Sequence, residues 1–343
     1  MNLPRISIVV PSFNQGLYLE ETLLSLLDQQ YPDLELFVVD GGSTDDSVDI
    51  IKKYEDRIDW WVSEKDKGQS EAINKGLTKV SGEIVSWVNS DDLLVPGSLQ
   101  TIAAIFSKLP QSTGLIHGGA IIFDANKEIE TRYTYQSPNK EAYLSGMVFP
   151  QPAAFFRKTV LDKVGLLNEG LHYGMDYDLF LRMALVCDFL PVKDVFAKYR
   201  LHQNSKSIAE SSRFISDWKR SFVNLCKHLG WKSEIEFLGN SGFYINEINY
   251  HHEFLFQYDF EIVGRIEKRK VLCLQLFHVL KDLYWIDKTK DARKLKKIIH
   301  KNFSNNWIAE DLRLKVILSK LMLPDFVLNS IRKVKRIFNS KTL

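Results

Sequence analysis

In the segment from Ile84 to Asp92, an apolar run is followed by four polar residues, Asn89 to Asp92, that could bind a cation. The run Ile-Val-Ser-Trp-Val is typical of a buried strand, and the residues after it are typical of a turn. Two adjacent carboxylates repel each other where the dielectric constant is low, so a fold that places them at a strand end often supplies a cation. The same four residues also fit an ordinary solvated turn. Other segments are needed to distinguish these interpretations.

Polar residues also follow two earlier predicted strands, in Pro11 to Asn14 and in Asp40 to Ser43. Strands are predicted at residues 5–11, 34–40, 58–63 and 84–89, and helices at 18–29, 45–54, 69–79 and 98–109. This alternation predicts right-handed crossovers and a mostly parallel α/β sheet. Because the carboxyl ends of parallel strands face one crevice, we expect the polar residues to converge there.

Asp40 is followed by two glycines, which let the backbone approach a planar ligand or a sugar. Its carboxylate could accept a hydrogen bond from a ribose hydroxyl or a base N–H, or it could simply form a turn or helix cap. Dinucleotide-binding oxidoreductases also carry an acid at the end of the second strand. However, the turn from Pro11 to Gly16 lacks the G-x-G-x-x-G pattern that contacts a pyrophosphate, which argues against an NAD-dependent dehydrogenase.

Asp176 and Asp178 open a helix predicted for residues 176–186. One of them could accept the proton of an attacking alcohol as a general base, or both could only stabilise the helix dipole. Arg182 lies four residues after Asp178 and could be its ion-pair partner.

Two further segments carry candidate ligand-binding groups. Asp66 to Gly68 precedes a predicted helix and offers backbone N–H groups and an acid to a nucleotide. Arg200 and His202, at the end of a strand predicted near residues 196–202, could bind a diphosphate or complete a metal site.

The composition is that of a globular protein. The chain has 343 residues, of which 45% are hydrophobic and 12% aromatic, enough for a substantial core. The start of the chain lacks a signal-peptide pattern, and no apolar run reaches the ~18 residues of a membrane span, so we expect a cytoplasmic protein. Its three cysteines are widely separated, which predicts reduced thiols.

The C-terminal part is basic and helical. Residues 287–343 hold 15 Lys and Arg against 5 Asp and Glu, although the net charge of the chain is only +2. We therefore divide the chain into an α/β domain at 1–210 and a helical, basic region at 211–343, with helices predicted at 214–229, 271–286 and 312–338. The region could serve membrane association, acceptor binding or oligomerisation. Its charge favours an anionic partner such as the inner face of a membrane, although a basic solvated helix is the commoner explanation; no nucleic acid is expected.

Six motifs in this order resemble those of glycosyltransferase family 2, over about residues 4–207. They are Pro11-Ser12-Phe13-Asn14, Val39-Asp40-Gly41-Gly42-Ser43-Thr44-Asp45, Asp66-Lys67-Gly68, Asn89-Ser90-Asp91-Asp92, Asp176-Tyr177-Asp178-Leu179 and Arg200-Leu201-His202. The resemblance implies a GT-A fold, a nucleotide-sugar donor, most simply a UDP-sugar, a Mn²⁺ or Mg²⁺ cofactor, and hexosyl or N-acetylhexosaminyl transfer with inversion. The expected acceptor is a hydroxyl of a glycan or lipid-linked saccharide in polysaccharide or glycolipid biosynthesis.

The resemblance also implies roles for individual residues. Asp91 would lie beside the donor ribose and sugar, and Asp92 and His202 would bind the metal. Asp176 falls at the position of the catalytic base, with Asp178 as the alternative, although the preceding residue is Met175 where the family commonly has glutamate. The remaining expected substrate-binding residues are Pro11, Asn14, Asp40, Asp66, Gln151, Asp178 and Arg200.

Two other functions are compatible with a nucleotide-sugar site. A sugar nucleotidyltransferase would be expected to carry a glycine-rich, basic phosphate loop after its first strand, and residues 12–16 are not such a loop. A non-catalytic nucleotide-sugar-binding protein would bind the donor without transfer or hydrolysis.

Overall fold

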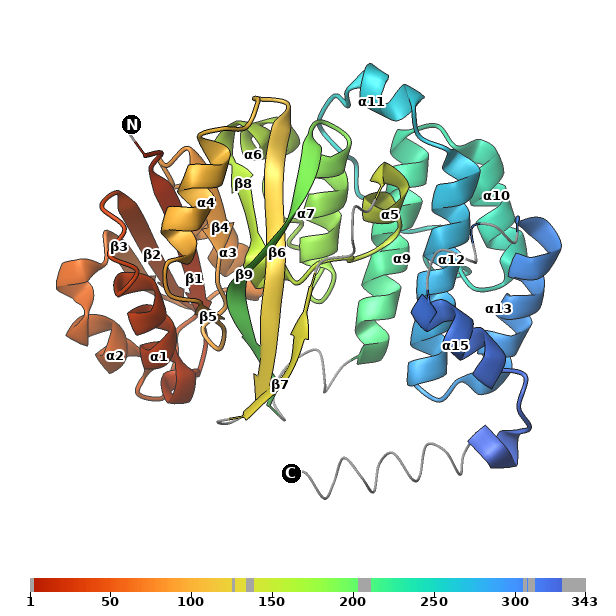
Figure 1. Cartoon of the computed structure of the whole chain (residues 1–343), viewed down its shortest axis with the longest axis horizontal. Helices are drawn as coiled ribbons and strands as arrows, with labels where there is room; N and C mark the ends of the chain where they lie inside the picture. The colour runs from red at the N-terminus through yellow and green to blue at the C-terminus, as the bar shows by residue number, and fades with distance from the viewer. Residues whose placement is uncertain are drawn as a thin grey trace.

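The computed structural model describes residues 3–124, 127–133, 139–202, 211–304, 307 and 312–328. Within these residues a nine-stranded sheet forms the N-terminal part, and a group of helices, α9 to α15, packs beside it (Figure 1). The expected boundary near residue 210 and the sequence after residue 328 lie outside the described residues.

The strands are β1 (Ile6–Ser12), β2 (Leu34–Asp40), β3 (Trp60–Ser63), β4 (Ile84–Trp87), β5 (Leu93–Leu94), β6 (Thr113–Asp124), β7 (Lys127–Arg132), β8 (Ala154–Arg157) and β9 (Asp188–Arg200). The helices are α1 (Gly16–Leu27), α2 (Ser47–Lys53), α3 (Gln69–Leu77), α4 (Ser98–Phe106), α5 (Lys140–Ser145), α6 (Lys158–Val164), α7 (Met175–Ala184), α9 (Ser211–His228), α10 (Lys232–Ser241), α11 (Phe260–Gly264), α12 (Lys268–Trp285), α13 (Thr289–Asn302) and α15 (Leu312–Lys320). Short 3-10 helices occur at Glu55–Arg57 and Gln151–Ala153.

The strand order in the sheet is β3-β2-β1-β4-β8-β6-β9-β5, with β7 paired to β6. Strands β3, β2, β1 and β4 are parallel, as the alternation of strand and helix predicts. Beyond them β8 runs antiparallel to both β4 and β6, and β9 is parallel to β6. The predicted α/β class is confirmed, with a parallel first half and a mixed second half.

The two faces of the sheet carry separate hydrophobic clusters. Ile8 of β1 packs on the face covered by α1, α2 and α4, whereas Val9 packs on the face covered by α3, α6 and α7. Helix α3 approaches β1 closely at Gly76, where a Cβ would lie 2.4 Å from Val9 Cγ1. A larger residue at position 76 would therefore push α3 away from the sheet.

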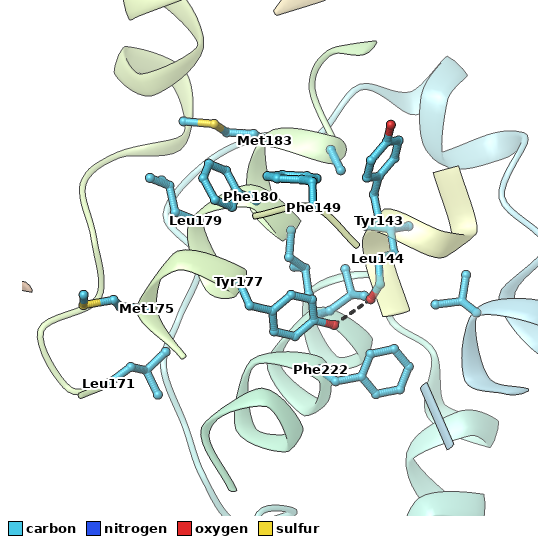
Figure 2. Close-up of a cluster of buried hydrophobic side chains, with 14 of the residues drawn as sticks. Tyr143, Leu144, Phe149, Leu171, Met175, Tyr177, Leu179, Phe180, Met183 and Phe222 are labelled. Carbon is cyan, nitrogen blue, oxygen red and sulfur yellow. Dashed lines mark hydrogen bonds between the residues drawn. The ribbon is translucent and has the colours of Figure 1, made fainter. Parts of the chain in front are cut away.

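The second cluster continues into the C-terminal helices. It contains Leu179 of α7, Phe222 of α9 and Leu272 of α12, all fully buried. Figure 2 shows Tyr177 of α7 beside Phe222, with its hydroxyl hydrogen-bonded to the carbonyl of Leu144 of α5. The predicted helices at 214–229 and 271–286 correspond to α9 and α12, and the helical region shares a continuous core with the sheet. Among the described helices, none combines the length and apolar character needed to span a membrane.

Candidate active site

The loops after β1 and β2 are joined by hydrogen bonds and form one wall of the site. The backbone N–H of Asn14 donates to Ser43 Oγ (2.7 Å), and Asn14 Oδ1 accepts from the N–H of Thr44 (2.9 Å). Asn14 has a φ of 51°, a conformation that asparagine adopts more readily than most residues. The exposed Asn14 therefore lies on the wall, while Pro11 is buried beneath it.

Asp40 is fully buried and organises the turn that follows β2. Its Oδ2 accepts from the backbone N–H groups of Gly42 (3.1 Å) and Ser43 (2.9 Å) and from Ser63 Oγ (2.7 Å). Because its oxygens are satisfied by the protein, Asp40 supports the wall and does not reach its surface. This differs from the expectation that Asp40 contacts the base directly.

Asp66 is the partly exposed acid at this end of the sheet. Its Oδ1 accepts from the N–H of Gly68 (2.8 Å), and a Cβ on Gly41 would lie only 2.6 Å from its Oδ2. Glycine at position 41 is therefore needed for this close approach. Burial raises the pKa of Asp66, and the nearby charge of Asp40 contributes to the rise.

The two aspartates after β4 point to different partners. Asp92 is 1% exposed, and its carboxylate accepts from the N–H of Arg200 (3.1 Å) and from Asn89 Nδ2 (3.2 Å). Burial, with the neighbouring charge of Asp91, raises the pKa of Asp92 well above its usual value. Asp91 Oδ2 instead lies 2.9 Å from Nε2 of His202, and these two side chains are 21% and 11% exposed. Asp91, not Asp92, therefore reaches the accessible surface together with His202.

Asp91 and His202, and not the expected pair Asp92 and His202, are the acid and imidazole that lie side by side at the accessible surface. A carboxylate oxygen and an imidazole nitrogen are both ligands that Mn²⁺ accepts. Neighbouring ligands of an octahedral cation lie about 3 Å apart, close to the 2.9 Å that separates these two atoms. The described part of the chain holds no group of three or more His, Cys, Asp or Glu side chains arranged for a metal. A cation here would need further ligands, such as phosphate oxygens of a donor.

Arg200 is held beneath the Asp91 loop. Its Nε donates to the carbonyl of Asp91 (3.0 Å), its Nη2 donates to Glu21 (2.5 Å), and its guanidinium lies 4.9 Å from the ring of Tyr18 and 4.4 Å from that of Phe123. With 6% exposure it supports the loop and presents little surface to a substrate. The ring of Tyr18 also lies 4.8 Å from that of His202.

Asn89 connects three segments at the floor of the site. Its Oδ1 accepts from Gln69 Nε2 (2.8 Å), and its Nδ2 donates to Asp92 and to Gln151 Oε1 (3.4 Å). Gln151 is buried and its Nε2 donates to the carbonyl of Trp87 (2.9 Å), so it fixes the end of β4. The expected substrate residue Gln151 therefore lies at the floor and not at the surface.

The acids at the start of α7 have separate environments. Asp176 is partly exposed, its Oδ1 accepts from the N–H of Tyr177 (2.8 Å), and burial of the carboxyl raises its pKa to about 6. Asp178 is fully buried and its Oδ2 accepts from Arg182 Nε (3.0 Å), the i, i+4 pair that the sequence suggested. Of the two acids, Asp176 is the one that can meet a substrate.

The start of α3, just after the Asp66 loop, contacts the start of α7 and the loop before it. Ser70 Oγ donates to the carbonyl of Leu171 (3.1 Å) and lies 2.7 Å from the sulfur of Met175. Met175, the first residue of α7, thus joins this helix to α3.

Comparisons with known proteins identify the family and the fold. The sequence model described as Glycosyl transferase family 2 matches residues 7–165. The chain contains a glycosyl transferase family 2 domain. An uncharacterised glycosyltransferase of Rickettsia typhi is 25% identical over 257 residues, which are 71% of this chain and 79% of the Rickettsia typhi protein. The match to an uncharacterised glycosyltransferase of Rickettsia felis covers only 38% of the Rickettsia felis protein. The GalNAc(5)-diNAcBac-PP-undecaprenol beta-1,3-glucosyltransferase of Campylobacter jejuni is 26% identical over 220 residues, 61% of this chain and 69% of that one.

Two solved structures share the fold of this glycosyltransferase. S. aureus TarS 1-349 in complex with UDP-GlcNAc superposes with a TM-score of 0.55 at 18% identity, covering 86% of this chain and 90% of that one. The mannosyltransferase PcManGT from Pyrobaculum calidifontis, in complex with GDP-Man and Mn²⁺, gives 0.53 at 15% identity, covering 93% and 79%. The GT-A fold is therefore confirmed.

Several supporting residues of the glycosyltransferase site were not expected from the sequence. Tyr18 and Glu21 lie three positions apart, which places them on one side of the helix after β1, but only the structure shows that they hold Arg200. Gln69 and Ser70 lie at the start of α3, and their partners are 20 or more positions away. No local pattern marks such contacts.

Proposed function

We propose that this glycosyltransferase moves a hexosyl or N-acetylhexosaminyl unit from a nucleotide-sugar donor to an acceptor hydroxyl, with inversion at the anomeric carbon. The observation that carries the proposal is Asp176, a partly exposed carboxyl whose pKa is raised to about 6 at the start of α7. A general base is most effective when its pKa lies near the working pH. The contact between Ser70 and Met175 brings this base next to the loop of Asp66.

In the proposed reaction the acceptor oxygen attacks the anomeric carbon from the face opposite the nucleoside diphosphate. The new C–O bond forms as the bond to the diphosphate breaks, and the hydroxyl proton passes to Asp176. The partly exposed Asp66 and the exposed Asn14, both on the wall built by β1 to β3, would bind the nucleoside. Asp40 and Pro11 would hold that wall from below.

We propose that Asp91 and His202 hold a Mn²⁺ or Mg²⁺ ion beside the diphosphate. Such a cation, when bound, supplies positive charge that offsets the charge of the leaving group. Arg200 and Asp92 would keep the Asp91 loop in place. The Mn²⁺ of the mannosyltransferase PcManGT supports a metal in a protein of this fold.

A UDP-sugar is the proposed donor. UDP-GlcNAc is bound by TarS and GDP-Man by PcManGT, so the fold accepts more than one nucleotide. We expect UDP-sugars with Mn²⁺ to raise the melting temperature more than GDP- or dTDP-sugars, because at equal concentration the ligand with the lowest Kd stabilises the folded state most. A ligand at 100 times its Kd adds about 2.7 kcal/mol to the stability of the folded state. A thermal-shift screen followed by a transfer assay measures this.

The same assay separates the alternatives. No shift with any nucleotide sugar would contradict the proposal. Binding without transfer or hydrolysis would favour a non-catalytic binding protein, and formation of a nucleotide sugar from a nucleoside triphosphate and a sugar phosphate would favour a nucleotidyltransferase.

We propose a lipid-linked saccharide as acceptor and peripheral binding to the inner face of a membrane. The Campylobacter jejuni relative is named for an undecaprenol-linked substrate.

Helix α13 carries four exposed lysines at positions 290, 294, 297 and 301, a spacing that puts them on one side of the helix. Arg293 and Lys296 instead donate to carbonyls at the end of α15, next to the exposed Met322 and Phe326. A row of exposed basic side chains is attracted to an anionic membrane surface.

Reversing the charge of Lys294, Lys297 and Lys301 to glutamate is expected to weaken binding to anionic vesicles by about a hundredfold or more, since each basic residue contributes about 1 kcal/mol. Sedimentation with phosphatidylglycerol vesicles measures it. A control with three exposed lysines of the sheet domain reversed, Lys52, Lys108 and Lys193, should bind like the wild type. Absence of sedimentation by the wild type would contradict the proposal.

A further inference from the structure

The carboxylate of Asp217, in helix α9, holds the loop that leads into α7. Its Oδ2 accepts hydrogen bonds from three consecutive backbone N–H groups, those of His172 (3.1 Å), Tyr173 (2.9 Å) and Gly174 (3.3 Å). Asp217 is 4% exposed, and its Oδ1 accepts from Arg220 Nη1 (3.3 Å). Successive N–H groups that converge on one anion form a concave backbone site in which the loop conformation depends on the anion.

This contact fixes the backbone just before α7, ending at the N-cap residue. Gly174 is the N-cap residue of α7, and it provides no side-chain hydrogen bond to the first turn. A negative charge beside a helix N-terminus is favourable, and here that charge comes from another helix. A Cβ on Gly174 would lie 2.9 Å from Asp217 Cβ and 2.9 Å from Trp218 Cδ1, so the glycine permits α9 to come this close.

The first turn of α7 is held on a second side as well. Tyr177 OH donates to the carbonyl of Leu144 (2.7 Å), and its ring packs edge-on against Trp218 at 6.3 Å (Figure 2 shows the hydrogen bond). Arg213 of α9 donates to Tyr173 OH (2.8 Å). In the sequence Asp176 lies between the loop held by Asp217 and the anchored Tyr177, so its backbone is held from both sides.

We propose that Asp217 is a positioning residue for the reaction: by holding residues 172–174 it sets the orientation of Asp176. This makes α9, which lies outside the matched residues 7–165, part of the catalytic apparatus. The inference rests on the proposed role of Asp176 as the base. It differs from a purely structural role because the effect of Asp217 must pass through Asp176.

The test is a double-mutant cycle with Asp217→Ala and Asp176→Asn. Asp217→Ala is expected to lower kcat by about a hundredfold, the typical cost of misplacing a reacting group by about 1 Å, while the donor Kd stays unchanged. In the Asp176→Asn background the same change should have little further effect on kcat. Asp217→Asn, which keeps an oxygen that can accept from the loop, should recover part of the rate. Glu261→Gln, a change at an exposed acid of α11, serves as the control and should leave kcat unaltered.

Hydrogen exchange separates failure of this inference from failure of the proposed function. Asp217→Ala should lose protection at the amides of residues 172–174 and keep it in β1 and β4, whether or not a donor has been found. Unchanged protection would overturn the inference, as would a wild-type kcat or a loss of rate that is fully additive with Asp176→Asn. If the wild-type protein transfers no sugar, the proposed function fails, and exchange still decides whether Asp217 holds the loop.

Discussion

Replacing Asp176 with asparagine is expected to lower kcat for sugar transfer by about 10²–10⁴-fold, the usual contribution of a general base. Asparagine has nearly the same shape but cannot take a proton at neutral pH. Because the Asp176 side chain accepts its hydrogen bond from the N–H of Tyr177 in its own helix, and asparagine keeps an oxygen for it, the fold and the donor Kd should be unaffected. Single-turnover rates and calorimetric titration with the donor measure the two quantities. Near-normal turnover by this variant would exclude Asp176 as the base.

The pH dependence of kcat provides a second measurement on the same residue. Burial raises the pKa of Asp176 from its usual 3.8 to about 6, so the carboxyl is protonated below that pH and cannot act as a base. In the wild-type enzyme kcat should therefore fall as the pH drops through about 6. The residual activity of Asp176→Asn should lack this limb of the profile.

Asp178 offers a matched comparison two residues away. Asp178→Asn removes the charge that Arg182 faces in the protein interior. Leaving a buried charge without its partner typically costs about 3–5 kcal/mol, so this variant should unfold at a clearly lower temperature. Loss of stability in one variant and loss of rate in the other would separate the two acids of the motif.

The first half of the fold is predictable because its signals are local. Strand β2 begins and ends where the apolar run does, at Leu34 and Asp40, and the glycines after it mark the turn. Strand β9 is different: it begins at Asp188, although Pro191, Lys193 and Asp194 interrupt the apolar pattern and only residues 196–202 were predicted. Its first half is fixed by pairing with β6, which includes bulges. Tertiary pairing overrides the local pattern there.

The site was predictable in its residues but not in their orientation. The sequence places Asp91 and Asp92 at one strand end, but their directions depend on Arg200 and His202, more than 100 positions away. Asp40 was expected at the ligand surface and is instead used by its own turn. The contact of Asp217 with the loop before α7 likewise joins segments more than 40 positions apart. Hydrophobic period and turn residues carry no information about such partners.

Replacing Asp91 with asparagine is expected to reduce Mn²⁺-dependent transfer by about 10²–10³-fold, the effect of losing one group that stabilises developing charge. An amide is a much weaker cation ligand than a carboxylate, but it can still hydrogen-bond to His202. The variant should therefore fold normally, because the side chain is partly exposed and loses little. Measurement of the Mn²⁺ concentration that gives half-maximal rate, together with the thermal shift produced by Mn²⁺ and donor, tests this.

The same substitution at Asp92 should have the opposite pattern. Asp92 is buried between the N–H of Arg200 and the side chain of Asn89, so Asp92→Asn exchanges one acceptor for a donor at a buried position. Mispairing of a buried polar group costs about 1–3 kcal/mol, so stability should fall while the response to Mn²⁺ persists in the folded protein. If Asp92→Asn instead loses the Mn²⁺ response and Asp91→Asn keeps it, the cation is held by the buried acid, and the loop must open to bind it. The two adjacent aspartates thus form their own control, because they differ in exposure and not in chemistry.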